Sequence, residues 1–71
     1  MESQLVAFGK VIKKYREEMG LSQEELANKA DFDRTYISLI ERGKRNLSLL
    51  NICRFASALN VKPSQLLENI V

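Results

Sequence analysis

Apolar residues recur at steps of three and four along most of this chain, and no stretch of five or more residues alternates strictly between apolar and polar. This spacing predicts amphipathic helices and no sheet. Five segments show it: one from about Ser3 to Met19, one of about eight residues after Ser22, one from Asp33 to a stop at Gly43, one between Ser48 and Asn60, and one that starts at Pro63.

Residues at the ends of these segments support the same division. Ser22 followed three positions later by Glu25 forms the S-x-x-E pattern of a capping box. Asp33 is a good N-cap because its carboxylate accepts from free backbone N–H groups. Gly20 and Asn60 suit the left-handed backbone that ends many helices. We therefore expect an all-α protein.

The second and third segments are separated by only three residues, 31–33. Helices joined this closely cross at a steep angle and need small or apolar residues where they meet. The required positions are filled by Leu26, Ala27, Ala30, Phe32, Ile37 and Ile40. Asp31 occupies the turn position that is commonly glycine, and Asp tolerates positive φ better than most residues. The spacing predicts a helix-turn-helix.

Charge is distributed unevenly along the 71 residues. The net charge is +2, but residues 34–54 hold five basic residues and one acidic residue, a local charge of +4, and the remainder carries −2. A basic segment next to a helix-turn-helix favours an anionic polymer such as DNA as the partner. There is one Cys and no His, which excludes an internal disulfide, a zinc cluster, and Ser-His or Cys-His nucleophilic catalysis. We expect no enzyme activity, no metal and no cofactor.

Two sequence stretches resemble a known family. Gln23-Glu24-Glu25-Leu26-Ala27 and Ile40-Glu41-Arg42-Gly43 resemble the phage-repressor and Cro-like helix-turn-helix proteins. The stretch 33–46 resembles, more narrowly, the controller proteins of restriction-modification systems. This resemblance implies a compact five-helix domain of the lambda-repressor type over residues 1–71, with the helix-turn-helix at about 23–42 and a dimerisation region at about 47–71. It also implies a homodimer that regulates its own operon from a two-fold symmetric operator.

The third segment carries the residues expected to read bases, since the N-terminal side chains of a recognition helix face the major groove. These are Arg34, Thr35, Tyr36 and Ser38. An Arg can donate two hydrogen bonds to a guanine, and a Thr methyl can pack on a thymine methyl. Tyr36 has an equally good alternative role in the core. Residues expected to contact phosphate flank this helix: Gln23, Lys44, Arg45, Asn46 and Ser48.

The resemblance also implies structural roles. It pairs Arg16 with Glu41 in a buried salt bridge, and it makes Glu24 a candidate contact for RNA polymerase. Apolar residues left over near the C-terminus predict pairing of two chains, and the interface residues expected are Leu50, Asn51, Leu66 and Ile70. Cys53 and Leu49 fall on the apolar stripe of the fourth segment, so both are expected to be buried.

Three alternatives stay open. A plain phage-type repressor would share the same fold and DNA contacts. An antitoxin or another protein-interaction module could reuse the fold without reading DNA. A small enzyme has the least support from the composition. Because no apolar run approaches the ~20 residues that span a bilayer and no signal-peptide pattern begins the chain, we expect a cytoplasmic protein of bacterial or phage origin.

Overall fold

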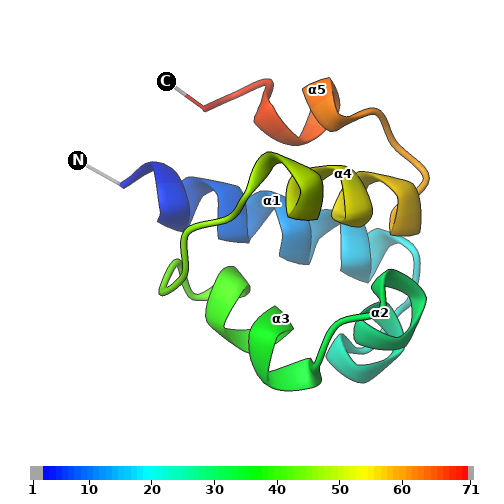
Figure 1. The fold of residues 1–71 in the computed structure, drawn as a ribbon. Coiled ribbons are helices and arrows are strands. Elements are labelled where there is room, and N and C mark those ends of the chain that lie inside the picture. The colour runs from blue at the N-terminus through cyan, green and yellow to red at the C-terminus, as the bar shows by residue number, and fades with distance from the viewer. Residues whose placement is uncertain (1–2, 71) are drawn as a thin grey trace.

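The computed structural model describes residues 3–70. Within this range there are five helices and no strand: α1 (Gln4–Glu18), α2 (Gln23–Ala30), α3 (Arg34–Glu41), α4 (Leu49–Ala58) and α5 (Pro63–Leu67) (Figure 1). Each predicted helix is present. The expectation of an all-α fold is confirmed.

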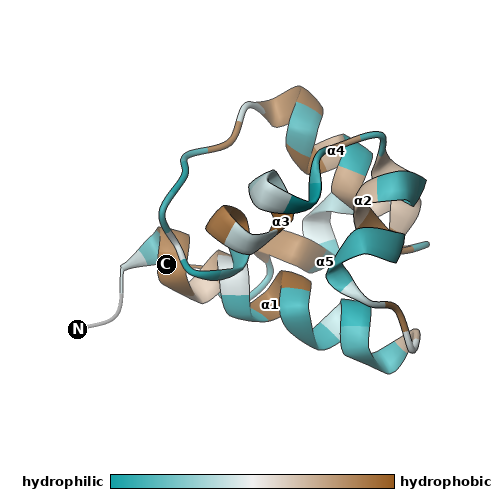
Figure 2. Cartoon of the chain, turned by 90° about the horizontal axis from the view of Figure 1, so that it is seen from below, coloured by the Kyte–Doolittle hydropathy of each residue, from teal (hydrophilic) through white to brown (hydrophobic). Residues whose placement is uncertain are grey.

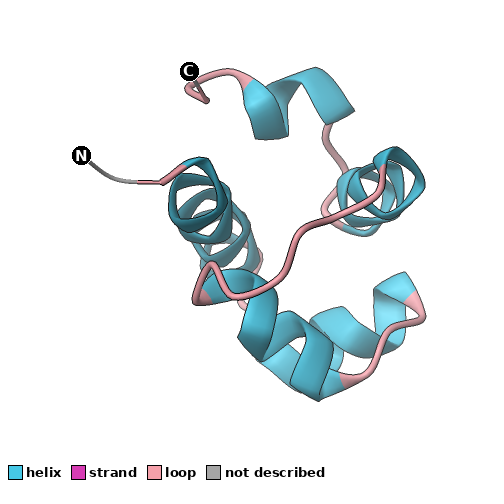
Figure 3. Cartoon of the chain, turned by 60° about the vertical axis from the view of Figure 1, so that its left-hand side comes forward, coloured by secondary structure: helices cyan, strands magenta, loops and turns pink. Residues whose placement is uncertain are grey.

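The helices form three tiers (Figures 1 and 3). α2 and α3 make one end of the molecule, α1 and α4 lie in the middle, and α5 lies at the opposite end. α3 packs against α1 and α2, whereas α4 packs against α2 and α5. The helix-turn-helix therefore rests on the middle tier and leaves one side of α3 open.

The helix ends follow from the capping residues that the sequence indicates. Ser22 Oγ accepts from the Glu25 amide at 3.0 Å, and Glu25 Oε1 accepts from the Ser22 amide at 2.8 Å, which completes the capping box. Asp31 and Asn60 adopt φ of 60° and 61°. Asp33 is the N-cap of α3, but its side chain makes no capping hydrogen bond. The predicted cap position is right, and the predicted carboxylate contact is absent.

Hydrophobic and hydrophilic stretches alternate along α1, as expected of a helix with one buried face (Figure 2). The core receives side chains from all five helices. Its fully buried large side chains are Phe55, Ile12, Leu26, Ile37, Ile40 and Leu66. Phe55 was not among the predicted core residues, although it lies three residues after Ile52 and four before Leu59, the spacing of one helix face. Leu49, which was expected to be buried, is instead 72% exposed, and Met19, the last apolar residue of the first predicted helix, is 39% exposed. Both lie at a helix end, where an apolar stripe can run past the edge of the core.

Two glycines let α1 approach α3 closely, which fixes the seat of the recognition helix. A Cβ at Gly9 would collide with the carbonyl oxygen of Ile40 and lie 2.7 Å from that of Glu41. Gly43 has φ of +71°, and a Cβ there would lie 2.6 Å from Val6. Larger residues would push the C-terminal end of α3 away from α1.

Candidate nucleic-acid interface

The helix-turn-helix is held together by apolar packing and by backbone hydrogen bonds at the turn. Leu26, Ile37 and Ile40 are at most 1% exposed. The Phe32 amide donates to the Ala27 carbonyl at 2.8 Å, which closes the end of α2. α2 and α3 therefore form one packed unit whose outer face is set by α3.

The first turn of α3 presents polar side chains to solvent. Arg34 and Thr35 are both exposed, as the base-reading prediction requires. Ser38, one turn further along, is half-buried, and its carbonyl accepts from Arg42 Nε at 3.3 Å. An exposed guanidinium and a small hydroxyl at the start of a helix match the chemistry that reads base edges in a major groove.

Tyr36 serves in packing. Its ring lies 4.8 Å from that of Phe32 and 6.2 Å from that of Phe55, measured between ring centroids. Its hydroxyl oxygen accepts from Asn51 Nδ2 at 3.1 Å. Of the two roles left open for Tyr36, the structure shows the core role. A base contact would use the hydroxyl proton.

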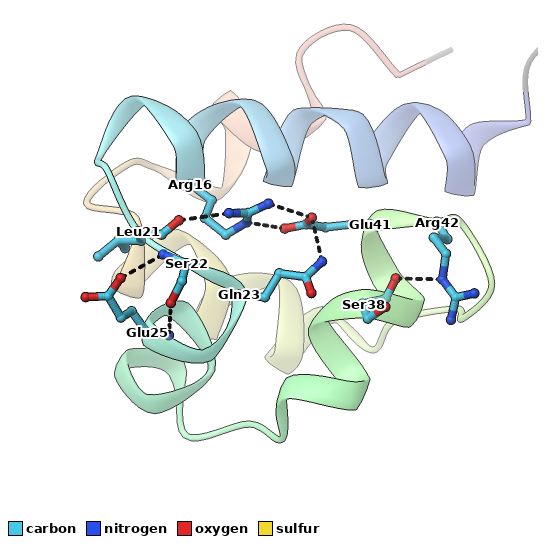
Figure 4. Close-up of polar contacts among 8 residues, drawn as sticks. All are labelled: Arg16, Leu21, Ser22, Gln23, Glu25, Ser38, Glu41 and Arg42. Carbon is cyan, nitrogen blue, oxygen red and sulfur yellow. Dashed lines mark hydrogen bonds and ion pairs between the residues drawn. The ribbon is translucent and has the colours of Figure 1, made fainter.

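A buried polar network joins α1, α2 and α3 (Figure 4). Arg16 Nε lies 2.6 Å from Glu41 Oε2, and Arg16 Nη2 donates to Glu41 Oε1 at 3.0 Å. Arg16 Nη1 donates to the Leu21 carbonyl at 2.8 Å. The two side chains are only 10% and 5% exposed, so the expected buried pair is present. The hydrogen bonds that Arg16 donates to Glu41, together with the negative charge of that carboxylate, raise the pKa of Arg16 above its usual value.

Gln23 belongs to the same network, which sequence reasoning did not foresee. Its Nε2 donates to Glu41 Oε1 at 3.1 Å (Figure 4). This bond fixes the amide at the N-terminus of α2, beside free backbone N–H groups that suit a phosphate. The amide nitrogen has a second hydrogen, so the expected phosphate contact is compatible with the bond to Glu41.

The segment after α3 carries exposed donors. Lys44, Arg45 and Asn46 are exposed. The Arg45 guanidinium lies 5.5 Å from the centroid of the Tyr36 ring. Ser48 is the N-cap of α4, where its Oγ accepts from the Asn51 amide at 3.1 Å. Capping explains Ser48 without DNA, whereas Lys44, Arg45 and Asn46 present side-chain N–H groups that suit phosphates.

The four residues predicted at the dimer interface differ in how far they are exposed. Leu50 is 69% exposed and is available to a second chain, and Ile70 is half-buried against the core. Asn51 is half-buried, and its side chain donates a hydrogen bond to the Tyr36 hydroxyl. Leu66 is fully buried, so its assignment to a dimer interface is wrong: α5 turns this side chain into the core of its own chain. Val71, another leftover apolar residue of the C-terminus, lies outside the described residues.

Three further residues complete the surface. Glu24 is exposed in the first turn of α2. Cys53 is a free thiol and is half-buried, less than expected for a small core residue. Arg54, which counts toward the basic segment, directs its guanidinium to carbonyl groups of the turn between α2 and α3. The sum of charges indicated DNA but could not separate Arg54 from the exposed cations.

Known proteins are similar to this chain in fold and sequence. A family model described as helix-turn-helix matches residues 12–66. Control protein C.MunI of Mycoplasma sp is 46% identical over 66 residues, which span 92% of this chain and 89% of the relative. No helix among the described residues is long and apolar enough to cross a membrane.

Two solved structures are also similar. The restriction-modification controller protein C.AhdI from Aeromonas hydrophila matches with a TM-score of 0.85 at 47% identity, over 87% of this chain and 94% of that chain. The controller protein C.Esp1396I, solved as a tetramer in complex with its natural 35 base-pair operator, matches with a TM-score of 0.86 at 40% identity. That match covers 99% of this chain and 92% of that chain.

Proposed function

The chain belongs to the helix-turn-helix family, and from that premise we propose that it is a sequence-specific, DNA-binding transcription regulator. The exposure of Arg34 and Thr35 at the start of α3 carries this proposal. Both residues stand on a helix whose opposite face is buried through Ile37 and Ile40, so their backbone positions are set before DNA arrives. Pre-positioned donors favour base reading over loose electrostatic attraction.

We infer that the regulator acts as a homodimer. One recognition helix reads about four base pairs, too few for a unique site in a genome. A two-fold pair doubles the site and places half-sites about 34 Å apart or at a related spacing. Leu49 and Leu50, which are 72% and 69% exposed side by side on α4, support a pairing surface in the region 47–71. The reading unit is then about 23–42 of a single domain, 1–71.

We further propose a role as the controller of a restriction-modification system. The similarity to C.MunI and C.AhdI, at 46% and 47% identity, supports this role. Activation needs a contact with RNA polymerase, for which exposed Glu24 on α2 is the candidate. A regulator of this kind works on DNA in the cytoplasm and performs no catalysis.

Selection from a random DNA duplex library at ~150 mM salt tests the reading function, because non-specific binding weakens steeply with salt. Sequencing of the bound fraction should give a two-fold symmetric site. Binding that only fades with salt, without enrichment, would contradict sequence-specific reading and would favour an antitoxin or another protein-interaction module.

A dose series separates the controller from a plain phage-type repressor. A reporter gene is placed behind the DNA upstream of the regulator's own gene, and the protein is supplied at increasing levels. A controller should raise the signal at low dose and lower it at high dose. A signal that only falls would support the repressor, and replacement of Glu24 by Gln should then change nothing.

A further inference from the structure

Arg54 lies on α4 but bonds to the turn of the helix-turn-helix. Its Nη2 donates to the Ala30 carbonyl at 2.9 Å, and its Nε donates to the same oxygen at 3.3 Å. Nη2 also donates to the Asp31 carbonyl. These oxygens are at the C-terminal end of α2, where backbone carbonyls have no partner within the helix and attract positive charge.

The same guanidinium covers the aromatic ring of the turn. Its central carbon lies 4.1 Å from the centroid of the Phe32 ring, the distance of a cation–π contact. Phe32 in turn packs against Phe55 at 4.9 Å between ring centroids, also from α4. One planar group therefore bonds the last carbonyls of α2 and stacks on the residue that leads into α3.

Few other contacts join α4 to the recognition helix. α3 packs on α1 and α2, while α4 packs on α2 and α5. A cleft of about 490 Å³ lies beside the turn, α3 and α4, and Tyr36, Asn51 and Arg54 are among its lining residues. α4 is joined to the reading unit by its packing on α2 and by side chains at this cleft. The Asn51–Tyr36 hydrogen bond and the ring contact between Tyr36 and Phe55 link it to α3, and the Arg54 guanidinium links it to the turn.

We propose that Arg54 is a positioning residue for DNA reading, which holds the turn between α2 and α3 and so sets the angle of α3, and that it is not a phosphate contact. This inference rests on the proposed DNA-binding function. Arg54 is then excluded from the electrostatic footprint that the basic segment predicts, although it carries the same charge as Arg34 and Arg45.

Replacement of Arg54 by Lys tests the geometry of the guanidinium while the charge is kept. A lysine ammonium is a point charge and cannot bond two carbonyls in one plane while it stacks on a ring. Lys13→Gln is the control for the loss of one positive charge, because it removes an exposed charge from α1, outside the helix-turn-helix. The full-length chain is titrated with the duplex that the wild-type protein selects and with a random-sequence duplex, each over a series of salt concentrations.

In Arg54→Lys we expect affinity for the selected duplex to fall about tenfold, the scale of a lost charged hydrogen bond. Affinity for the random duplex should change less than about twofold, and the dependence on salt should stay unchanged. The ratio of the two affinities does not depend on the fraction of folded protein, so a merely destabilised variant would leave it constant. An unchanged ratio would overturn the proposal.

Arg54→Gln supplies the opposite test. If Arg54 contacts phosphate, this variant should weaken both duplexes alike and lower the salt slope by about one, which would contradict the positioning role. If Arg54 only positions the turn, the slope should match that of the wild-type protein. Lys13→Gln should leave the affinity ratio unchanged.

Hydrogen exchange of the protein alone separates this inference from the DNA-binding function. In Arg54→Lys, the Phe32 amide, which donates to the Ala27 carbonyl, should exchange about tenfold faster relative to the amides of α1. Unchanged relative exchange would refute the positioning role of Arg54, whatever the protein does with DNA. Faster exchange in a protein that selects no DNA site would support the positioning of the turn and contradict the proposed DNA-binding function.

Discussion

The half of the molecule formed by α1, α2 and α3 differs from the α4–α5 half in how completely contacts within the chain satisfy its polar groups and cover its apolar side chains. In the first, the charged pair of Arg16 and Glu41 is buried, and its oxygens and nitrogens are bonded to each other, to Gln23 and to Leu21. In the second, leucines 49, 50 and 67 remain 72%, 69% and 39% exposed.

This difference indicates a division of labour. A recognition helix must meet DNA at a fixed angle, and buried hydrogen-bonded networks give a surface one defined arrangement. Exposed neighbouring leucines bury apolar area only when another surface covers them. The first half therefore has the fixed arrangement that the proposed reading of DNA needs, and the second has the exposed apolar surface that the proposed second copy would cover.

The largest expected effect on stability comes from breaking the buried ion pair of Arg16 and Glu41, which joins α1 to α3. Arg16→Met leaves Glu41 charged and buried without its partner, which should lower the free energy of unfolding by about 3–5 kcal/mol, measured by urea denaturation. The double variant with Glu41→Leu removes both charges and should be more stable than Arg16→Met. A loss below about 1 kcal/mol would show that the pair does not hold the reader in place.

A smaller change tests the close contact of α1 and α3. Gly9→Ala should favour the helical state of α1 by about 1 kcal/mol through helix propensity alone. The collision of the new methyl with the Ile40 carbonyl opposes this gain, and we expect a net loss of about 1–3 kcal/mol in thermal or urea unfolding. A net gain in stability would show that α1 can move away from α3 without penalty.

The α4–α5 half is tested by Leu50→Lys. Because Leu50 is 69% exposed in one chain, the unfolding free energy of the monomer should stay within about 0.5 kcal/mol of wild type. The dimer dissociation constant, measured by sedimentation equilibrium, should rise about tenfold or more as leucine burial is lost. Asn28→Lys adds the same charge at an exposed position of α2 and should leave the dimer dissociation constant unchanged. Equal dissociation constants for both variants would remove Leu50 from the interface.

The smallest effect concerns the capping box of α2. Hydrogen bonds with Ser22 lower the pKa of Glu25, and the bond with the Ser22 backbone N–H has a larger effect than the bond with its side chain. A group with a lowered folded pKa stabilises the protein above its unfolded pKa of about 4.3 and loses that contribution as pH falls further. The stability difference between wild type and Glu25→Gln should therefore stay constant near neutral pH and shrink as the pH falls through about 4.3 and below. A constant difference would show that the carboxylate is not held in its charged form.

Local signals in the sequence predicted the helices well. Ser22 and Glu25 mark a helix start through contacts within four residues, and Asp31 adopts the positive φ that the turn requires. The candidate reading residues Arg34 and Thr35 follow from the position of Asp33 alone. Such features depend on neighbours in the chain, so a sequence pattern reveals them.

Features that depend on distant packing were harder to predict. Leu50 and Leu66 are both apolar residues of the C-terminal region, yet one is 69% exposed and the other is fully buried. Arg34 and Arg54 lie in the same basic segment, but Arg54 bonds to a turn 23 residues earlier in the chain. Spacing gives the face of a helix, and only the tertiary arrangement gives what that face meets.

The selection experiment repeated with Arg34→Ala tests whether the first turn of α3 reads bases in a two-fold pair. The variant should lose preference at one base step in each half-site and retain the rest of the symmetric site, because one bidentate contact is worth about 1–3 kcal/mol at one base pair. Arg45→Ala, run in parallel, should keep the whole site and weaken all sequences alike. An unchanged site with Arg34→Ala, or an equal weakening of every sequence, would contradict the account.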